Sequence, residues 1–296
     1  MTSFPSSVIT YATLVDLVDS PVASHENSQG DEITAIETML VNKTYVMQNY
    51  LTGLKLSNNG TDPTNDIDIA AGYCADSTNA TMLNLAASIT KRLDASWGVG
   101  TNQGGLDTGA IANTTYHLWL IKRSDTGVVD CLFSASASAP TMPANYDYKR
   151  RIGSIVRTGA AIKTFVQDGD VFTWLVPAPN SVVTNPGTSA LTTTLVLPVG
   201  VRVRAIVGVL GYGSTASADP QSVFISDLSI TDTAPTASYF SIVNYNGSAV
   251  ANNVGGMVNV FTNTSAQVRA RCQTSAATTE LYITAHGWVD DRGRNG

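Results

Sequence analysis

The chain has 296 residues, of which 43% are hydrophobic and only 14% are charged, so it holds enough apolar material for a large core. Its formal net charge is −6 and its pI is about 4.9, which excludes the basic footprint of a nucleic-acid-binding protein. With so few charges, the surface must consist largely of Thr, Ser, Asn, Ala and Gly. No apolar run approaches the roughly 20 residues that span a bilayer, so membrane insertion is not expected.

The first 43 residues differ in composition from the rest and are interpreted as an attachment arm followed by one helix. Residues 1–21 are sparsely charged and lack the basic and apolar regions of a signal peptide, so assembly in the cytoplasm is expected. A helix is predicted over 21–40, because Pro21 suits a first helical position and three of the four glutamates follow it. Three apolar residues there have the spacing of a coiled-coil seam: Ile33, Ile36 and Leu40.

Two interpretations of this helix remain open. It packs on its own β domain, or three copies form a short parallel coiled coil, since Ile at core positions favours more than two strands.

After Asn42 the chain consists of short β-branched and aromatic runs separated by Gly, Pro, Asn and Asp, a pattern typical of all-β proteins. Residues 82–93 fit a strand or a helix, and the neighbouring strands favour a strand. Asp168-Gly169 between two apolar runs is a strong hairpin signal. Further strands are predicted at 51–56, 67–73, 116–122, 128–134, 146–155, 162–166, 171–177, 199–210, 222–230, 237–245, 257–262, 266–273 and 280–289.

The predicted fold class is mainly β: a β-sandwich or jelly-roll-like region preceded by an extended arm and one short N-terminal helix. Three domains are expected, namely the arm and helix at 1–43, a first β-rich region at 44–180 and a second at 181–296. The last boundary rests on the turn residues between Ala178 and Thr188. Alternatively, the two β-rich regions form one continuous sandwich.

The segment from Gly105 to Ile155 carries an ordered set of motifs: G-L-D-T-G, Y-H-x-W-L-I, G-V-V-D, L-F-S, A-P-T-x-P and Y-x-x-x-R-R-I-G. Two further motifs end the chain, N-T-S-A-Q-V-R-A-R at 263–271 and G-W-V-D-D-R-G-R at 287–294. Together they resemble a module of bacteriophage fibre and virion appendage proteins, and the resemblance covers most of the chain from about Gly53 onward.

The resemblance implies a structural virion protein, a short fibre or spike that is a homotrimer. Its N-terminal arm would attach to other virion proteins, and its β-rich region would face outward for host-surface adhesion. Neither catalysis nor a cofactor is expected. The alternatives are a carbohydrate-binding module or a decoration or adaptor protein of the virion, and a polysaccharide depolymerase is the least favoured.

Exposed aromatic residues on loops can stack on sugars, although packing in a core or an interface is the competing interpretation. The candidates for contact with a host-surface glycan are Trp97, Tyr212, Tyr239 and Tyr245. Leu106-Asp-Thr-Gly matches half of an aspartic protease site, but that chemistry needs two such aspartates. No catalytic residue is therefore assigned.

No metal site is predicted, because the Cys and His residues lack metal-ligand spacing. Cys74, Cys131 and Cys272 are expected to be buried free thiols, and His117 and His286 to be hydrogen-bonded histidines within strands. Lys149-Arg150-Arg151 forms a charged patch, and Asp290-Asp291 is interpreted as a surface pair that is solvated or paired with a cation rather than catalytic. Arg269 and Arg271 alternate with apolar residues, so one face of their sheet is expected to be wet or to meet a neighbouring subunit.

Overall fold

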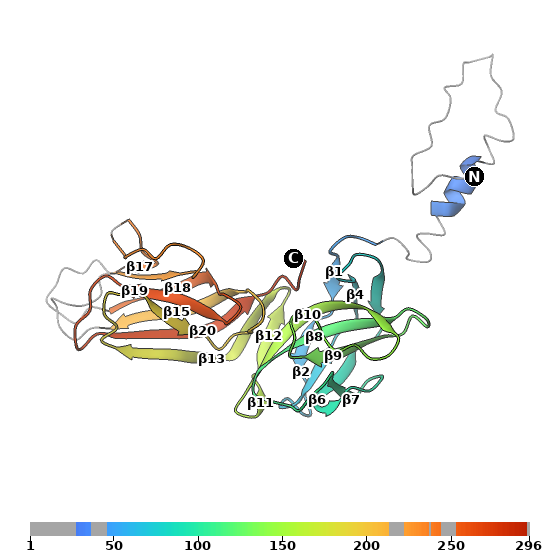
Figure 1. Ribbon diagram of the computed structural model, residues 1–296, viewed down its shortest axis with the longest axis horizontal. Coiled ribbons are helices and arrows are strands. Elements are labelled where there is room, and N and C mark those ends of the chain that lie inside the picture. The colour runs from blue at the N-terminus through green and yellow to red at the C-terminus, as the bar shows by residue number, and fades with distance from the viewer. Residues whose placement is uncertain (1–27, 37–45, 213–221, 237, 244–252, 295–296) are drawn as a thin grey trace, which may run out of the picture.

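A computed structural model of the chain (Figure 1) describes residues 28–36, 46–212, 222–236, 238–243 and 253–294. The fold is mainly β, as predicted, with one helix at residues 28–36 and twenty strands in the described residues. The arm at 1–21 and the seam residue Leu40 lie outside these residues. In the helix, Ile33 is 56% exposed and Ile36 is 38% exposed.

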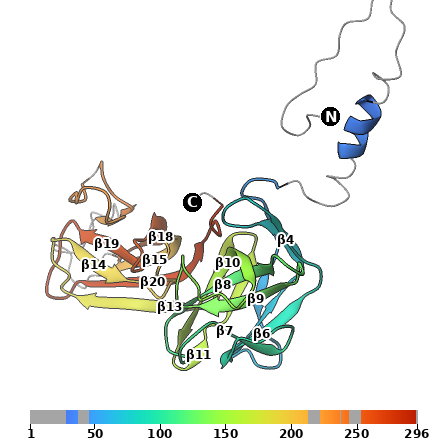
Figure 2. The same cartoon turned by 45° about the vertical axis from the view of Figure 1, so that its right-hand side comes forward.

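The first β region, which follows the helix, contains an eight-stranded sheet and a three-stranded sheet. The large sheet has the order β11-β10-β8-β9-β7-β6-β3-β2 and curves strongly, as Figure 2 shows, while β5 of the small sheet contacts β8 and β9. The small sheet consists of β1 (Leu51–Gly53), β4 (Gly72–Ala75) and β5 (Met82–Leu85). The large one consists of β2 (Leu56–Asn58), β3 (Asp66–Ile69), β6 (Ile89–Ser96), β7 (Gln103–Leu106), β8 (Thr115–Arg123), β9 (Val129–Ser134), β10 (Tyr146–Thr158) and β11 (Ala161–Ile162).

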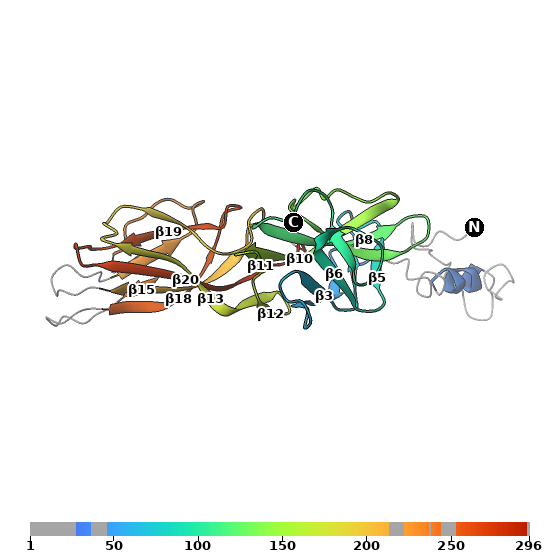
Figure 3. The same cartoon turned by 90° about the horizontal axis from the view of Figure 1, so that it is seen from below.

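The second β region is a sandwich of a five-stranded and a four-stranded sheet (Figure 3). The first sheet has the order β12-β13-β20-β15-β18 and the second the order β14-β19-β16-β17. The strands of the first are β12 (Phe165–Asp168), β13 (Val171–Thr184), β15 (Arg204–Tyr212), β18 (Asn253–Phe261) and β20 (Glu280–Val289). Those of the second are β14 (Leu191–Thr194), β16 (Ser222–Ser226), β17 (Ile242–Val243) and β19 (Gln267–Cys272).

The strand alternation seen in the sequence decides which side chains enter the sandwich. In β15, Ala205, Val207 and Val209 are at most 3% exposed, whereas Arg204 faces outward. Alternating residues point to opposite faces of a strand, so a run of every second apolar residue must bury one face. The hairpin predicted at Asp168-Gly169 joins β12 to β13, and residues 82–93 form β5 and β6 rather than a helix.

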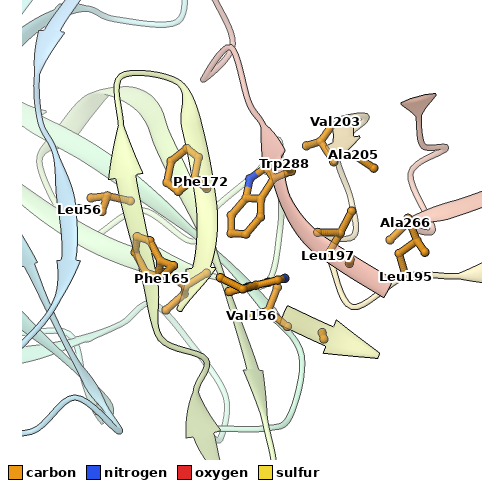
Figure 4. Close-up of a cluster of buried hydrophobic side chains, with 14 of the residues drawn as sticks. Leu56, Val156, Phe165, Phe172, Leu195, Leu197, Val203, Ala205, Ala266 and Trp288 are labelled. Carbon is orange, nitrogen blue, oxygen red and sulfur yellow. The ribbon is translucent and has the colours of Figure 1, made fainter. Parts of the chain in front are cut away.

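A continuous apolar core links the two β regions (Figure 4). Phe172 and Trp288 of the second region stack with ring centroids 4.9 Å apart, and Phe165 lies 5.8 Å from Phe172. Leu56 of the first region is buried in the same cluster. Gly153 allows this approach, because a Cβ there would lie 2.6 Å from the Leu56 side chain.

The boundary expected between residues 180 and 181 falls inside β13, Val171–Thr184, which runs on without a break. The sheet instead changes between β11, ending at Ile162, and β12, starting at Phe165. The prolines at 177 and 179 belong to a section of β13 where the register to β20 shifts, so they mark an irregular strand and not a linker.

Candidate functional site

A pocket of about 390 Å³ lies on the outer surface formed by β2, β3 and β6. Its wall is mostly polar, with one amide, one carboxylate, one ammonium and three hydroxyl groups. The lining residues are Lys55, Ser57, Asn59, Asp68, Ala70, Ser88, Ile89 and Thr90.

The sequence of β3 places a carboxylate in this pocket. Ile67 and Ile69 are fully buried, so Asp68 between them must point to the opposite face of the sheet. In the sheet register, Asp68 lies opposite Ser57 of β2 on one side and opposite Thr90 of β6 on the other. Three strands therefore bring three polar side chains into one row.

Hydrogen bonds hold this row in place. Asp68 Oδ1 accepts one from Asn59 Nδ2 at 2.8 Å and one from Thr90 Oγ1 at 2.6 Å. Asn59 is itself fixed, because its Oδ1 accepts the backbone N–H groups of Thr61 at 2.8 Å and Asp62 at 3.0 Å. Asp68 Oδ2 accepts no hydrogen bond from the part of the chain that the structure describes. The carboxylate is thus oriented by one oxygen and open to a ligand at the other.

This arrangement suits the binding of a hydroxyl-rich ligand. A carboxylate accepts hydrogen bonds, an ammonium donates them, and the Ser and Thr hydroxyls do both. The pocket wall contains a single carboxylate, Asp68, whereas glycoside hydrolysis ordinarily uses a pair of them on either side of the bond. The lining therefore favours binding over cleavage.

The sequence analysis did not select these pocket residues. The alternation D-I-D-I at 66–69 was a usable signal, since it places Asp66 and Asp68 on the face away from the core. What the sequence does not contain is the register that brings Ser57 and Thr90 beside Asp68.

None of the three predicted glycan-contact residues that the structure describes, Trp97, Tyr212 and Tyr239, lines this pocket. Trp97 is half-buried: its Nε1 donates to the Cys131 carbonyl at 3.0 Å, and its ring meets Tyr146 edge-on with centroids 5.2 Å apart. Tyr212 at the end of β15 is 38% exposed, and Tyr239 before β17 is 58% exposed. Tyr245 lies outside the described residues.

The outer face of the five-stranded sheet is apolar and exposed. Val182 of β13, Tyr282 of β20 and Leu210 of β15 form one cross-strand row in the register. Val182 is 56% exposed and Leu210 is 39% exposed, and farther along the face Met257 is 56% exposed. Large exposed apolar patches on a protein surface commonly mark interaction sites.

The glycine-rich loop at 97–105 is built around Lys91, a side chain with no solvent exposure. Its Nζ donates to the carbonyls of Gly98 at 2.6 Å and Gly100 at 3.2 Å, and lies 3.1 Å from Asp130 Oδ1. Asp130 in turn accepts the backbone N–H of Gly100 at 2.8 Å. The loop thus encloses a lysine of its own chain.

Arg151 of the charged patch and Asp290 are buried, which corrects the expectation that Asp290 lies at the surface and confirms that it is paired. Arg151 is 8% exposed and Asp290 is 2% exposed, and they form a bidentate pair at 2.6 and 2.7 Å. Burial raises the pKa of Asp290, but the hydrogen bonds and positive charge of Arg151 outweigh it and hold that pKa below its ordinary value. Asp291 remains partly exposed beside them.

His117 extends this buried pair into a network. Its Nδ1 lies 2.9 Å from Ser154 Oγ, which also accepts Arg151 Nη1 at 3.1 Å. Burial and the charge of Arg151 lower the pKa of His117 to about 4, so the ring is neutral at neutral pH. The expectation of a hydrogen-bonded histidine holds for Nδ1 and is wrong for Nε2, which is buried and has no hydrogen-bond partner among the described residues.

The face carrying Arg269 and Arg271 is partly covered by the loop after β16. Arg269 Nη1 donates to the Ile230 carbonyl at 3.0 Å, and Arg271 Nη1 donates to Asp232 at 3.0 Å. The side chains of Arg269 and Arg271 remain 15% and 22% exposed, and contact with a neighbouring subunit stays a prediction.

The three cysteines are free and buried, as predicted. Burial raises the pKa of Cys74 to about 12 and that of Cys272 to about 11, so these thiols stay protonated. The described ranges hold no group of three or more His, Cys, Asp or Glu side chains arranged for a metal ion. Nor does any helix within those ranges have the length and apolarity to cross a membrane.

No family model matches the chain, and no curated protein matches it.

Proposed function

We propose that this protein is a structural subunit of a bacteriophage particle, a short fibre or spike whose β region adheres to the host surface by binding saccharide. The pocket at Asp68 carries the adhesive part of this proposal, because it presents preoriented polar groups on a rigid sheet. The motif resemblance supports the virion part. The role requires binding and no turnover.

The pocket chemistry implies weak binding by each site. Its lining includes two aliphatic side chains, Ala70 and Ile89, and no aromatic ring on which a sugar face could stack. A few hydrogen bonds that replace bonds to water contribute only about 1 kcal/mol each. Several copies on one particle convert weak sites into strong attachment, since linked sites gain about 10²–10⁴ in avidity. Weak saccharide binding by each polar pocket is therefore compatible with strong adhesion by an oligomeric appendage.

Charge distribution supports attachment through the N-terminal arm. The first 42 residues contain six Asp and Glu and no Lys or Arg, so they account for the whole net charge of −6. The remaining 254 residues carry equal numbers of acidic and basic side chains. A segment of one sign attracts a partner surface of the other sign. We therefore propose a basic surface on another virion protein as the attachment partner.

Self-association is supported by exposed apolar side chains on two elements. Ile33 and Ile36 are exposed on the helix, and the row of Val182, Tyr282 and Leu210 lies on an open sheet face. Light scattering on the full-length protein tests the trimer: a mass near three times 31.1 kDa is expected. Replacing Ile33 and Ile36 with Asp should give monomers. If this variant remains a trimer, the helix is not the interface, and the exposed face of the five-stranded sheet becomes the candidate.

The adhesive role is tested by titrating the full-length protein with purified host-surface polysaccharide. Asp68→Asn keeps the shape of the side chain and removes its charge, so we expect at least a tenfold loss of affinity, about 1.4 kcal/mol. Asp94→Asn is the matched control, because Asp94 lies on neighbouring β6 in an exposed ion pair with Arg92 at 3.4 Å.

Equal losses in the two variants, or no binding by the wild-type protein, would reject saccharide adhesion and leave a decoration or adaptor role. Release of reducing sugar ends from the polysaccharide would reject the non-catalytic reading.

A further inference from the structure

β18, Asn253–Phe261, is the one long edge strand among the described residues. It ends the five-stranded sheet and pairs with β15 along all nine of its residues. The other seven sheet edges in the described residues are strands of two to four residues, namely β1, β2, β5, β11, β12, β14 and β17. Proteins commonly keep edge strands short, because a long edge offers its unpaired N–H and C=O groups to another strand.

β18 also lacks the other features that protect a sheet edge. Its sequence, N-V-G-G-M-V-N-V-F, contains no charged residue and no proline, and its pairing with β15 has no bulge. On the outer face of the sheet, Met257 is 56% exposed and Phe261 is 46% exposed. On the other face, Val254 and Val260 enter the core of the sandwich. A long, regular and uncharged edge of this kind is a predicted site of strand addition.

The sequence outside the described residues contains a segment of matching character. Residues 7–15 read S-V-I-T-Y-A-T-L-V, which is nine residues, as in β18, and six of them are β-branched or aromatic. The segment has no charge, no proline and no glycine. In an extended conformation, alternation gives it two apolar faces, with Ile9 and Tyr11 on one and Val8 and Leu14 on the other. Segments with this composition are prone to pair with other strands.

We propose that residues 7–15 add to β18 as a sixth strand of the five-stranded sheet. The added strand pairs with the outer backbone groups of β18 and covers Met257 and Phe261 on the outer face. A charged side chain placed beside this apolar edge would lose its water without gaining a partner. The uncharged segment therefore fits the edge better than the rest of the arm, where acidic residues begin at Asp16.

Strand addition gives the two parts of the arm different roles. The acidic stretch from Asp16 to Glu37 remains available for a basic partner surface, since none of its charges lies in residues 7–15. A strand supplied by a neighbouring copy would also tie the oligomer together. The inference depends neither on saccharide binding at Asp68 nor on the helix as an oligomer seam.

Cross-linking of the full-length protein tests the contact. Tyr11 is the middle residue of 7–15 and Met257 is the middle residue of β18, so the two lie side by side in either strand direction. A short bismaleimide should join Tyr11→Cys/Met257→Cys in high yield, and the mass of the product shows whether the link joins one chain or two. Either product supports the contact. The native cysteines are buried and should not react.

The matched control is Tyr11→Cys/Val182→Cys. Val182 is 56% exposed, like Met257, but it lies on β13, three strands or about 14 Å from β18. We expect little cross-linking in this variant.

Hydrogen exchange of the full-length protein provides the second measurement. In the wild type we expect slow exchange at the alternate amides of β18 that point away from β15, because paired amides open rarely. Tyr11→Pro removes a donor from the middle of 7–15, so these amides should exchange roughly tenfold faster or more. Ser3→Pro, outside the segment, should match the wild type, and β20 in the middle of the sheet should be unchanged in all three proteins.

Three results would overturn the proposal. Equal cross-linking of the Val182 control would show that the contact is nonspecific. Fast exchange of the outer β18 amides in the wild type would show that the edge is open. Slow exchange that survives Tyr11→Pro would assign the edge to a different strand, and cross-linked dimers of Met257→Cys alone would identify that strand as β18 of a second copy.

Discussion

The buried pair of Arg151 and Asp290 joins segments 139 residues apart, so its loss should weaken the contact between the two β regions and lower the stability of the fold. Asp290→Asn keeps the shape of the side chain and removes its charge. The Arg151 side chain, 9% exposed, would then be left buried without its counterion. Removing one member of a buried ion pair costs about 3–5 kcal/mol, against a total stability of about 5–15 kcal/mol for a typical domain. We expect a fall in Tm of roughly 10 °C.

Chemical unfolding of Asp290→Asn beside wild type measures this cost. Asp94→Asn is the control, because its pair with Arg92 is exposed and pairs of that kind contribute about 0–1 kcal/mol. The double variant Arg151→Met/Asp290→Leu should recover most of the loss, since an apolar pair of similar volume leaves no buried charge. A cost for Asp290→Asn no larger than that of the control would refute the role of the pair.

The dependence of stability on pH provides a second test of the same pair. The pKa of Asp290 is lower in the folded protein than its ordinary value of about 3.9. A carboxyl of this kind stabilises the fold above its unfolded pKa, and this stabilisation is lost as the pH falls through the folded pKa. The wild-type protein should therefore lose stability below about pH 4, and Asp290→Asn should lose less over the same range.

Two further predictions follow from buried positions. Gly287→Ala should cost more than about 2 kcal/mol in chemical unfolding, because a Cβ there would lie 2.1 Å from the backbone oxygen of Phe172; a neutral effect would contradict the register between β13 and β20. His117 has a pKa of about 4 in the folded protein and near 6.5 in the unfolded chain, so the unfolded state takes up a proton first as the pH falls. The free energy of unfolding should therefore decline by up to roughly 3 kcal/mol as the pH is lowered from 6.5 to 4. His117→Gln should lack this decline in a pH series of unfolding curves, and an unchanged pH profile would exclude His117 as its source.

Local patterns were sufficient to predict most of the strands, although β7 and β14 were not predicted. The hairpin at Asp168-Gly169 is set by a glycine with φ of +57°, a conformation that glycine adopts without strain. The inward residues of β15 follow from alternation alone. Both signals lie within about ten residues, which is why sequence reasoning finds them.

Long-range pairing was not predictable in the same way. Arg150, Arg151 and Asp290 appear in the sequence as ordinary charged runs, and such runs usually face water. Arg151 and Asp290 are buried as partners of each other, 139 residues apart, and the sequence contains no local signal for that pairing. The prolines near the boundary expected at 180 lie inside β13 for a related reason: the strand tolerates them because its pairing with β20 shifts there.

The edge strand of the pocket, β2, is held in place by a contact with the second β region. β2 is only three residues long, and the backbone N–H of Leu56 donates to Gln167 Oε1 of β12 at 2.7 Å in a buried position. Gln167→Leu would leave that N–H without an acceptor, at a cost of about 1–3 kcal/mol concentrated on β2. Because Ser57 follows Leu56, we expect polysaccharide affinity to fall several-fold although no pocket residue is changed. Unchanged affinity in a destabilised Gln167→Leu protein would show that the Asp68 row is held by β3 and β6 alone.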